Sequence, residues 1–231
     1  MKRNLVFLVF IIAMMGALPS YSQLYFKAGA GYGAGAQKLL LETQYAATYT
    51  ENVFASFGGN FGVDLAAGYE LNQYVDFEFD LGYQNGRSVT VNQVFSYKTY
   101  VGRLIYLGPS LVFKTSINKN ISPYGKLGLF TGLPLTKVIV GGTEKTFRGG
   151  IPLGYNGALG AVYNLSETFK VYIETYSQSM IYRPTRRREL NGDVVKFKNK
   201  LDTPAPSNQE LTHHQFSFGA LGINMGIKIV F

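Results

Sequence analysis

The chain lacks cysteine and tryptophan altogether, and it is poor in charge. Without cysteine, a disulfide framework, a thiolate metal site and a lipobox cysteine are all excluded. Charged residues make up 16% of the 231 residues, whereas soluble domains carry about 25%. Beyond the N-terminal segment, no stretch approaches the roughly 20 consecutive apolar residues that a transmembrane helix needs. We therefore expect no helical span after that segment, and no metal or cofactor.

The N-terminal segment has the composition of a secretory signal peptide. Lys2 and Arg3 precede an apolar run over residues 5–18, and the small residues Ser20 and Ser22 then stand before Gln23. A short basic region, a short apolar run and small residues at a cleavage site are typical of export signals. We expect residues 1–22 to be the signal peptide and residues 23–231 to form one domain outside the cytoplasm. An uncleaved anchor is the alternative.

The rest of the chain shows a hydrophobic period of two. Between Val75 and Tyr83 every odd-numbered residue is apolar, whereas the even-numbered residues are acidic or glycine. Strict alternation predicts a strand with one apolar and one polar face. Each predicted strand is long enough for the 9–11 residues of a tilted membrane strand. The eight predicted strands are 24–36, 58–71, 75–86, 100–114, 122–133, 153–165, 169–180 and 215–231.

The connections between these strands alternate in length. After the second, fourth and sixth strands they are short, at 72–74, 115–121 and 166–168. The long connections are 37–57, 87–99, 134–152 and 181–214. Short turns at one end, long loops at the other and an even strand number describe an outer-membrane barrel. The pattern predicts an all-β fold, an eight-stranded antiparallel up-and-down transmembrane β-barrel, with apolar faces toward lipid and polar faces toward the lumen.

The last predicted strand carries the most specific signal. From Leu221 to Phe231 every odd-numbered residue is apolar, and the other face carries Gly222, Asn224, Gly226 and Lys228. An alternating strand with a terminal aromatic residue resembles the signal read by the outer-membrane insertion machinery, with Phe231 as that residue. The whole exported chain resembles the eight-stranded OmpA-type barrels, within the small outer-membrane β-barrel proteins. The resemblance implies the outer membrane of a Gram-negative bacterium, periplasmic N- and C-termini, and periplasmic chaperones and insertion machinery as partners during biogenesis. A soluble exported β-protein is the non-membrane alternative.

Two points of architecture stay open in the sequence. A ten-stranded barrel is possible if residues 89–98 and 192–201 form an extra hairpin, although we favour strand extensions above the membrane there. Arg103 shares its face with apolar residues such as Leu107 and Leu111. It lies either outward at the extracellular rim or inward beyond a bulge near Gly102.

The inward face of the predicted barrel is rich in charge of both signs. An eight-stranded barrel is just wide enough for side chains to fill it. We therefore expect an ion-pair network that closes the lumen, with little steady conductance. The alternative is a proton or ion path, or a transient gate. The predicted inward charges are Lys27, Asp64, Glu70, Asp76, Glu78, Asp80, Lys126, Lys170, Glu174 and Lys228.

Glycine lines the inward face of the first predicted strand, at positions 29, 31, 33 and 35. These small residues leave room for bulky inward residues opposite, such as Tyr172, Tyr176 or Phe130. A small ligand cavity in the upper lumen is the alternative interpretation.

The fourth long connection is basic. Arginine clusters suit bidentate binding of phosphate, and the phosphates of lipopolysaccharide are the anions expected at an extracellular rim. A solvated loop with surplus charge is the alternative, and a chain in this location is not expected to bind nucleic acid. The predicted lipopolysaccharide contacts are Arg183, Arg186, Arg187 and Arg188.

No residues make a convincing catalytic site. His213, His214 and Ser217 lie close together, and a Ser–His pair can attack an ester, but their spacing does not match outer-membrane lipid A deacylases. We expect a non-enzymatic, monomeric barrel with a structural or surface-interaction role through its long extracellular loops and outer-membrane lipid as its partner. Binding or transport of a small ligand, hydrophobic ligands included, is the main functional alternative, and a lipid-modifying enzyme is the other.

Overall fold

The computed structural model describes residues 23–45, 50–93, 96–117, 120–189, 192–197 and 214–231. The predicted signal peptide, residues 1–22, lies outside the described residues. The described chain is all-β, and none of it forms a helix long and apolar enough to cross a membrane.

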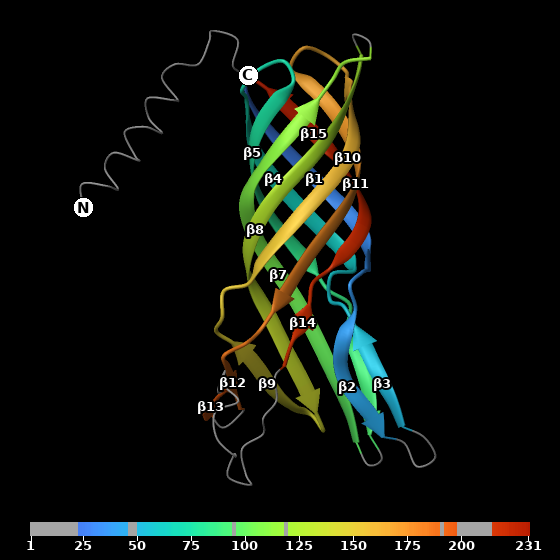
Figure 1. Ribbon diagram of the computed structural model, residues 1–231, viewed down its shortest axis with the longest axis vertical. Helices are drawn as coiled ribbons and strands as arrows, with labels where there is room; N and C mark the ends of the chain where they lie inside the picture. The colour runs from blue at the N-terminus through green and yellow to red at the C-terminus, as the bar shows by residue number, and fades with distance from the viewer. Residues whose placement is uncertain (1–22, 46–49, 94–95, 118–119, 190–191, 198–213) are drawn as a thin grey trace, which may run out of the picture.

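Eight strands close into an antiparallel barrel (Figure 1). Each pairs with the next along the chain, and β15 returns to pair with β1 from Tyr25↔Val230 to Gly35↔Ala220. The eight-stranded prediction is confirmed. The ten-stranded alternative is wrong, because the short strands formed within residues 89–98 and 192–201 do not become members of the closed ring. The barrel strands are β1 (Leu24–Gly35), β4 (Asn60–Glu70), β5 (Val75–Asn85), β7 (Ser96–Lys114), β8 (Ile121–Val140), β10 (Leu153–Asn164), β11 (Phe169–Tyr182) and β15 (Ala220–Val230).

One end of the barrel, here the turn end, carries the short connections and the C-terminus (Figure 1). The Asn72 side-chain oxygen accepts hydrogen bonds from the backbone N–H groups of Tyr74 and Val75, at 2.8 and 2.9 Å. This bonding satisfies the backbone of the tight turn between β4 and β5. Phe231 donates its N–H to the Leu24 carbonyl, so the last residue is held against the first barrel strand.

The opposite end, here the loop end, is walled by further strands (Figure 1). Residues 89–98 extend the wall as predicted, because β6 pairs with the start of β7. The predicted strand end at 133 is wrong, because β8 runs to Val140 and β9 pairs back onto it, so most of the long connection at 134–152 is a strand hairpin. Gly141 and Gly142 both have positive φ, as a two-residue hairpin turn requires. The added strands are β2 (Leu39–Tyr45), β3 (Thr50–Ala55), β6 (Val89–Gln93), β9 (Thr143–Arg148), β12 (Arg186–Arg188), β13 (Val194–Lys196) and β14 (Phe216–Ser217).

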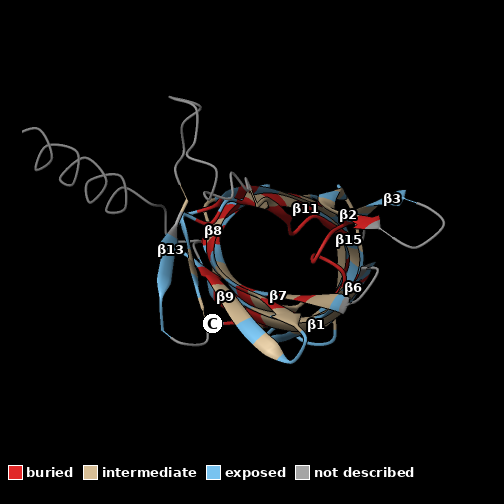
Figure 2. Ribbon diagram, turned by 90° about the horizontal axis from the view of Figure 1, so that it is seen from below, coloured by how far each residue is buried: buried red, intermediate tan, exposed pale blue. Residues whose placement is uncertain are grey.

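The two faces of the wall follow the predicted alternation. On β8 the outward Leu127, Leu129 and Leu133 are each about two-thirds exposed, whereas inward Lys126 is buried. Arg103 lies on the outer face, and the β7–β8 register runs through this region without a shift, so no bulge turns it inward. Looking along the axis shows a single closed wall with buried residues on its inner side (Figure 2).

Candidate functional site

The lumen near the turn end holds a buried cluster of ion pairs. Lys27 lies 3.4 Å from Glu78 and 3.8 Å from Glu174. Lys126 lies 2.9 Å from Glu78 and 2.6 Å from Asp80. All five side chains are less than a tenth exposed. The barrel strands β1, β5, β8 and β11 are thereby joined across the lumen.

A second group of ion pairs lies closer to the turn end. Lys114 contacts Glu70 and Asp76 at 2.9 and 2.7 Å, and Lys228 contacts the same two carboxylates at 3.8 and 3.6 Å. Sequence reasoning missed Lys114, because it is the last residue of its strand. Its even number places it on the same inward face as Val112, and that parity is the signal that identifies it.

Tyrosine hydroxyl groups bind carboxylates that the lysines leave incompletely bonded. The Tyr25 hydroxyl donates to Glu78 at 2.9 Å or to Asp76 at 3.2 Å, and Tyr124 donates to Glu174. The Lys228 ammonium group lies 3.4 Å from the centre of the Tyr25 ring, within cation–π range. Buried ion pairs roughly offset their own desolvation, so the clear effect of this charged layer is to fill the lumen.

Two of the predicted inward charges lie apart from these ion pairs. Asp64 accepts a hydrogen bond from the Tyr172 hydroxyl at 3.2 Å and forms no ion pair with a described residue. Lys170 lines a chamber of about 170 Å³ at the turn end and likewise has no carboxylate within ion-pair distance in the described chain. The Tyr25 hydroxyl, within reach of both Asp76 and Glu78, links the two groups of ion pairs. Together these groups contain Lys27, Glu70, Asp76, Glu78, Asp80, Lys126, Glu174 and Lys228, with Lys114 in addition.

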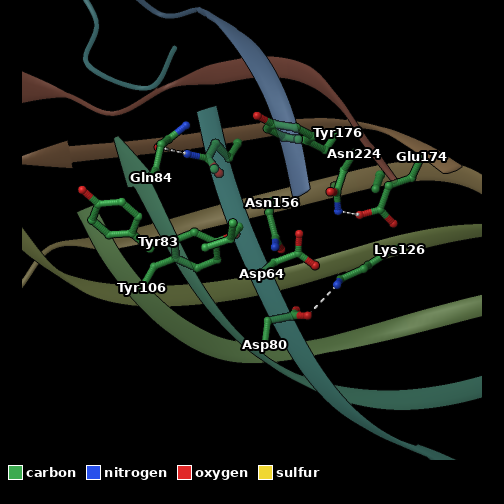
Figure 3. A pocket seen from close by; sticks show the side chains of 16 residues that line it. Asp64, Asp80, Tyr83, Gln84, Tyr106, Lys126, Asn156, Glu174, Tyr176 and Asn224 are labelled. Atoms are coloured by element: carbon green, nitrogen blue, oxygen red, sulfur yellow. Dashed lines mark hydrogen bonds and ion pairs between the residues drawn. The ribbon is translucent and has the colours of Figure 1, made fainter. Parts of the chain in front are cut away.

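A small polar cavity lies beyond the charged layer (Figure 3). Its volume is about 60 Å³, and Asp64, Asp80, Lys126, Asn156 and Asn224 line it. A water molecule needs about 10–15 Å³ by this measure, so the cavity suits a few waters and is too small for a larger ligand.

Two of the four inward glycines of β1 lie under aromatic residues, as the sequence predicts. A Cβ atom at Gly29 would meet the Tyr172 hydroxyl, and one at Gly33 would lie 2.6 Å from the Tyr176 hydroxyl. The other two, Gly31 and Gly35, lie against the backbone of Ile223 and Ser56. Phe130 lies instead against Gly154, where a Cβ would come within 2.6 Å of its ring. Tyrosine side chains therefore occupy the space beside Gly29 and Gly33.

Two copies of the tripeptide Ser-Phe-Gly close the lumen toward the loop end. These twin SFG segments, 56–58 and 217–219, lie just before β4 and β15, with Gly59 between the first segment and β4. Ser56 donates through its hydroxyl to the Gly219 carbonyl at 2.7 Å, and Phe57 donates its N–H to the Ser217 carbonyl at 2.7 Å. Both phenylalanines are fully buried, with ring centres 6.0 Å apart.

A pair of glutamines fixes the twin SFG segments to the barrel wall. Gln178 donates to Gln84 at 2.7 Å and lies 3.2 Å from the Phe218 carbonyl, while Gln84 donates to the Gly58 carbonyl. Sequence reasoning missed this plug and placed residues 58–59 and 215–219 in strands that actually begin at Asn60 and Ala220. The repeated tripeptide is the signal that was available.

An aromatic cluster continues from the plug toward the loop end. Phe216 packs against Phe57 and Phe147, with ring centres 5.9 and 4.8 Å away. His214 lies in the same cluster, 4.9 Å from the Phe147 ring. The Ser217 hydroxyl is buried and accepts from the Gly219 N–H at 3.2 Å. These two residues therefore serve packing and turn formation; His213 lies outside the described residues.

The predicted lipopolysaccharide contacts divide between two faces of the wall. Arg183, Arg186 and Arg188 are exposed, whereas Arg187 lies on the other face and contacts Glu189 at 2.7 Å. Lys145 contacts the same carboxylate at 2.9 Å. Partial desolvation acts to raise the pKa of Glu189, but the two cations outweigh it and hold that pKa below its usual value. Arg187 is thus part of an internal ion-pair group.

The closed wall, its apolar outer surface and the filled lumen together define a small membrane β-barrel. A family model for the outer membrane protein beta-barrel domain matches residues 5–221. The chain therefore belongs to the outer membrane β-barrel family, which places it in the outer membrane.

Several solved outer-membrane protein structures resemble the chain at low sequence identity. A major outer membrane protein from Thermus thermophilus is 12% identical, with 91% of this chain and 100% of that chain covered and a TM-score of 0.50. Neisserial surface protein A is 13% identical, with coverages of 90% and 97% and a TM-score of 0.47. The outer membrane protease OmpT from Escherichia coli is 12% identical, with the same coverages and a TM-score of 0.44. No curated protein matches the chain significantly. At such identities the comparisons speak to the fold alone.

Proposed function

We propose that this chain is a non-conducting, non-enzymatic barrel with a structural or surface-interaction role, and that its loop end faces the cell exterior. The supporting observation is the lumen, which side chains fill from the charged layer to the aromatic cluster. In barrels of this class short turns lie on the periplasmic side and long loops outside, which supports the proposed orientation and periplasmic termini. The surface for interaction is then the strand-walled loop end.

The proposed closure is tested by reconstituting the folded chain in planar bilayers and recording single-channel currents. We expect little or no steady conductance in salt solution, because buried ion pairs and a buried aromatic cluster fill the described lumen. Insertion is verified in the same samples by heat-modifiable migration on a gel. Large and stable currents from inserted protein contradict the proposal.

The orientation requires a separate test in cells. A protease added to intact cells should cut the loop end and leave the turns at 72–74 and 166–168 uncut. Cleavage of those turns before the membrane is permeabilised contradicts the proposed orientation.

A further inference from the structure

Three arginines from three strands stand in one row on the outer face of the wall. Arg103 on β7 pairs with Leu135 on β8, and Arg148 on β9 pairs with Arg186 on β12. Thr136 pairs with Phe147, so Leu135 and Arg148 are the next positions along that same ladder. Neighbouring strands lie about 4.8 Å apart, so the row spans about 14 Å. Arg188 follows Arg186 on the same face, two residues further along β12.

The pair Arg148–Arg186 is unfavourable as it stands. Like charges directly opposite each other on neighbouring strands are destabilising. Neither guanidinium group has a carboxylate of the described residues within ion-pair distance, and the same holds for Arg103. Two nearby cations do have carboxylate partners, since Lys137 pairs with Glu144 at 2.7 Å and Arg187 pairs with Glu189. The arrangement needs an external anion.

The row lies at the edge of the lipid-facing apolar surface. Leu133 is the preceding outward residue of β8 and is 67% exposed, and Leu135, within the row, is 52% exposed. Leu153, on the adjoining strand β10, is 79% exposed. Two residues of a strand advance about 7 Å, so the guanidinium groups lie at the edge of this apolar surface, where we expect the lipid headgroups to begin. A soluble anion gains nothing from this apolar neighbourhood. A lipid can use both features, because its headgroup can contact the arginines while its chains contact the leucines.

We propose that Arg103, Arg148 and Arg186, with Arg188 beside them, bind the phosphate groups of phosphorylated lipid headgroups in the outer leaflet. Guanidinium groups bind phosphate bidentately, and a phosphate between Arg148 and Arg186 turns their repulsion into two favourable contacts. This inference rests on the proposed orientation of the loop end. It replaces the single-loop contact expected from the sequence by a site shared between β7, β9 and β12.

The test measures binding of diphosphorylated lipid A to the folded full chain in an uncharged detergent. The variant Arg148→Gln/Arg186→Gln should bind about thirtyfold more weakly. Each arginine near a lipid surface contributes about 1 kcal/mol, and the variant removes two of them. The matched control is Lys38→Gln/Arg87→Gln, which removes the same charge from a separate groove that these two residues line together with Phe54. The control should bind like the original chain. An equal loss in both variants shows unspecific charge attraction and overturns the proposal.

Two further measurements separate lipid phosphate from other causes. Lipid A without its phosphates should bind the original chain as weakly as the variant does, and millimolar inorganic phosphate should not compete. Equal binding of the dephosphorylated lipid, or competition by inorganic phosphate, overturns the assignment. Without lipid, the double variant should unfold at the same or a higher temperature, because it relieves the repulsion; a large fall shows a structural role instead. None of these results depends on conductance or orientation, so the proposed function is tested separately.

Discussion

Lys126 is the residue on which the charged layer depends most. It is the only cation within 4 Å of Asp80 among the described residues, and it also contacts Glu78. Both carboxylates are almost fully buried. Removing one partner of a buried ion pair leaves an uncompensated charge, which costs much more than the pair contributes.

Lys126→Met should therefore lower the free energy of unfolding by about 3–5 kcal/mol. The control Lys137→Met removes a similar contact from the exposed pair with Glu144 and should cost at most about 1 kcal/mol. Both are measured by urea titration of the folded chain in lipid vesicles. Adding Asp80→Asn to Lys126→Met should restore part of the loss. Equal effects of the two lysine variants exclude a special role for Lys126.

Residue-level predictions from the sequence succeeded where parity alone decides. Alternation places Lys27, Glu78 and Lys126 in the lumen, and the structure buries them there. Which carboxylate a lysine contacts depends on how far its side chain reaches across neighbouring strands, and the odd–even pattern of the sequence does not give that distance. Lys170 and Lys228 occupy paired positions, yet only Lys228 contacts carboxylates. The sequence did not show that Arg103 lies beside Arg148 and Arg186, because this placement depends on the register between their strands.

At the scale of strands, inward tyrosines face glycines on neighbouring strands. Tyr25 is paired with Gly68 and Tyr106 with Gly82. In both pairs a Cβ atom on the glycine would collide with the tyrosine ring. Such pairs let a narrow barrel hold large rings without forcing its strands apart.

Gly68→Ala should destabilise the barrel by about 1–3 kcal/mol, the usual range for overpacking. The matched control is Gly125→Ala, because a Cβ there would meet only Leu159, at an ordinary 3.5 Å. The measurement is the temperature at which the heat-modifiable band is lost. A fall for the control as large as for Gly68→Ala shows that strand glycines matter for another reason.

The strands of the barrel were predictable because both faces carry a period of two, from Val75 to Asn85 above all. The wall beyond the barrel was less so. Val138, Val140 and Phe147 turn inward to form an apolar core at the loop end, which reverses the polar-inside pattern of the lumen. Because the inner face is apolar at the loop end, the alternation of polar inward and apolar outward residues that identified the other strands is lost there. The Gly141–Gly142 turn is still visible in the sequence.

At the scale of the whole molecule, two different fillings close the lumen in series. The charged layer lies toward the turn end, and the twin SFG segments with the aromatic cluster lie toward the loop end. The glutamine pair, Gln84 and Gln178, lies between them. Neither filling depends on contacts made by the other.

Phe57→Ala should therefore leave the barrel without steady conductance, because the charged layer still fills the lumen. It should lower the unfolding free energy by about 3–5 kcal/mol, as truncation of a buried phenylalanine does. Phe54→Ala is the control, since Phe54 is 55% exposed and its loss should cost little. Planar-bilayer recording and thermal unfolding give the two readouts. Steady currents from the Phe57 variant show that the aromatic filling is the sole barrier.

The pairing of β1 with β15 also governs the order of assembly. These strands are the first and the last of the barrel, and their register begins at Tyr25↔Val230. All ring pairings that do not involve β15 can form while that strand is still absent, but β1 and β11 then each expose a row of unbonded backbone groups. Open edges of this kind recruit other chains. The chain is thus most prone to aggregate just before its final strand docks, and docking of that strand ends the hazard at both edges in one step.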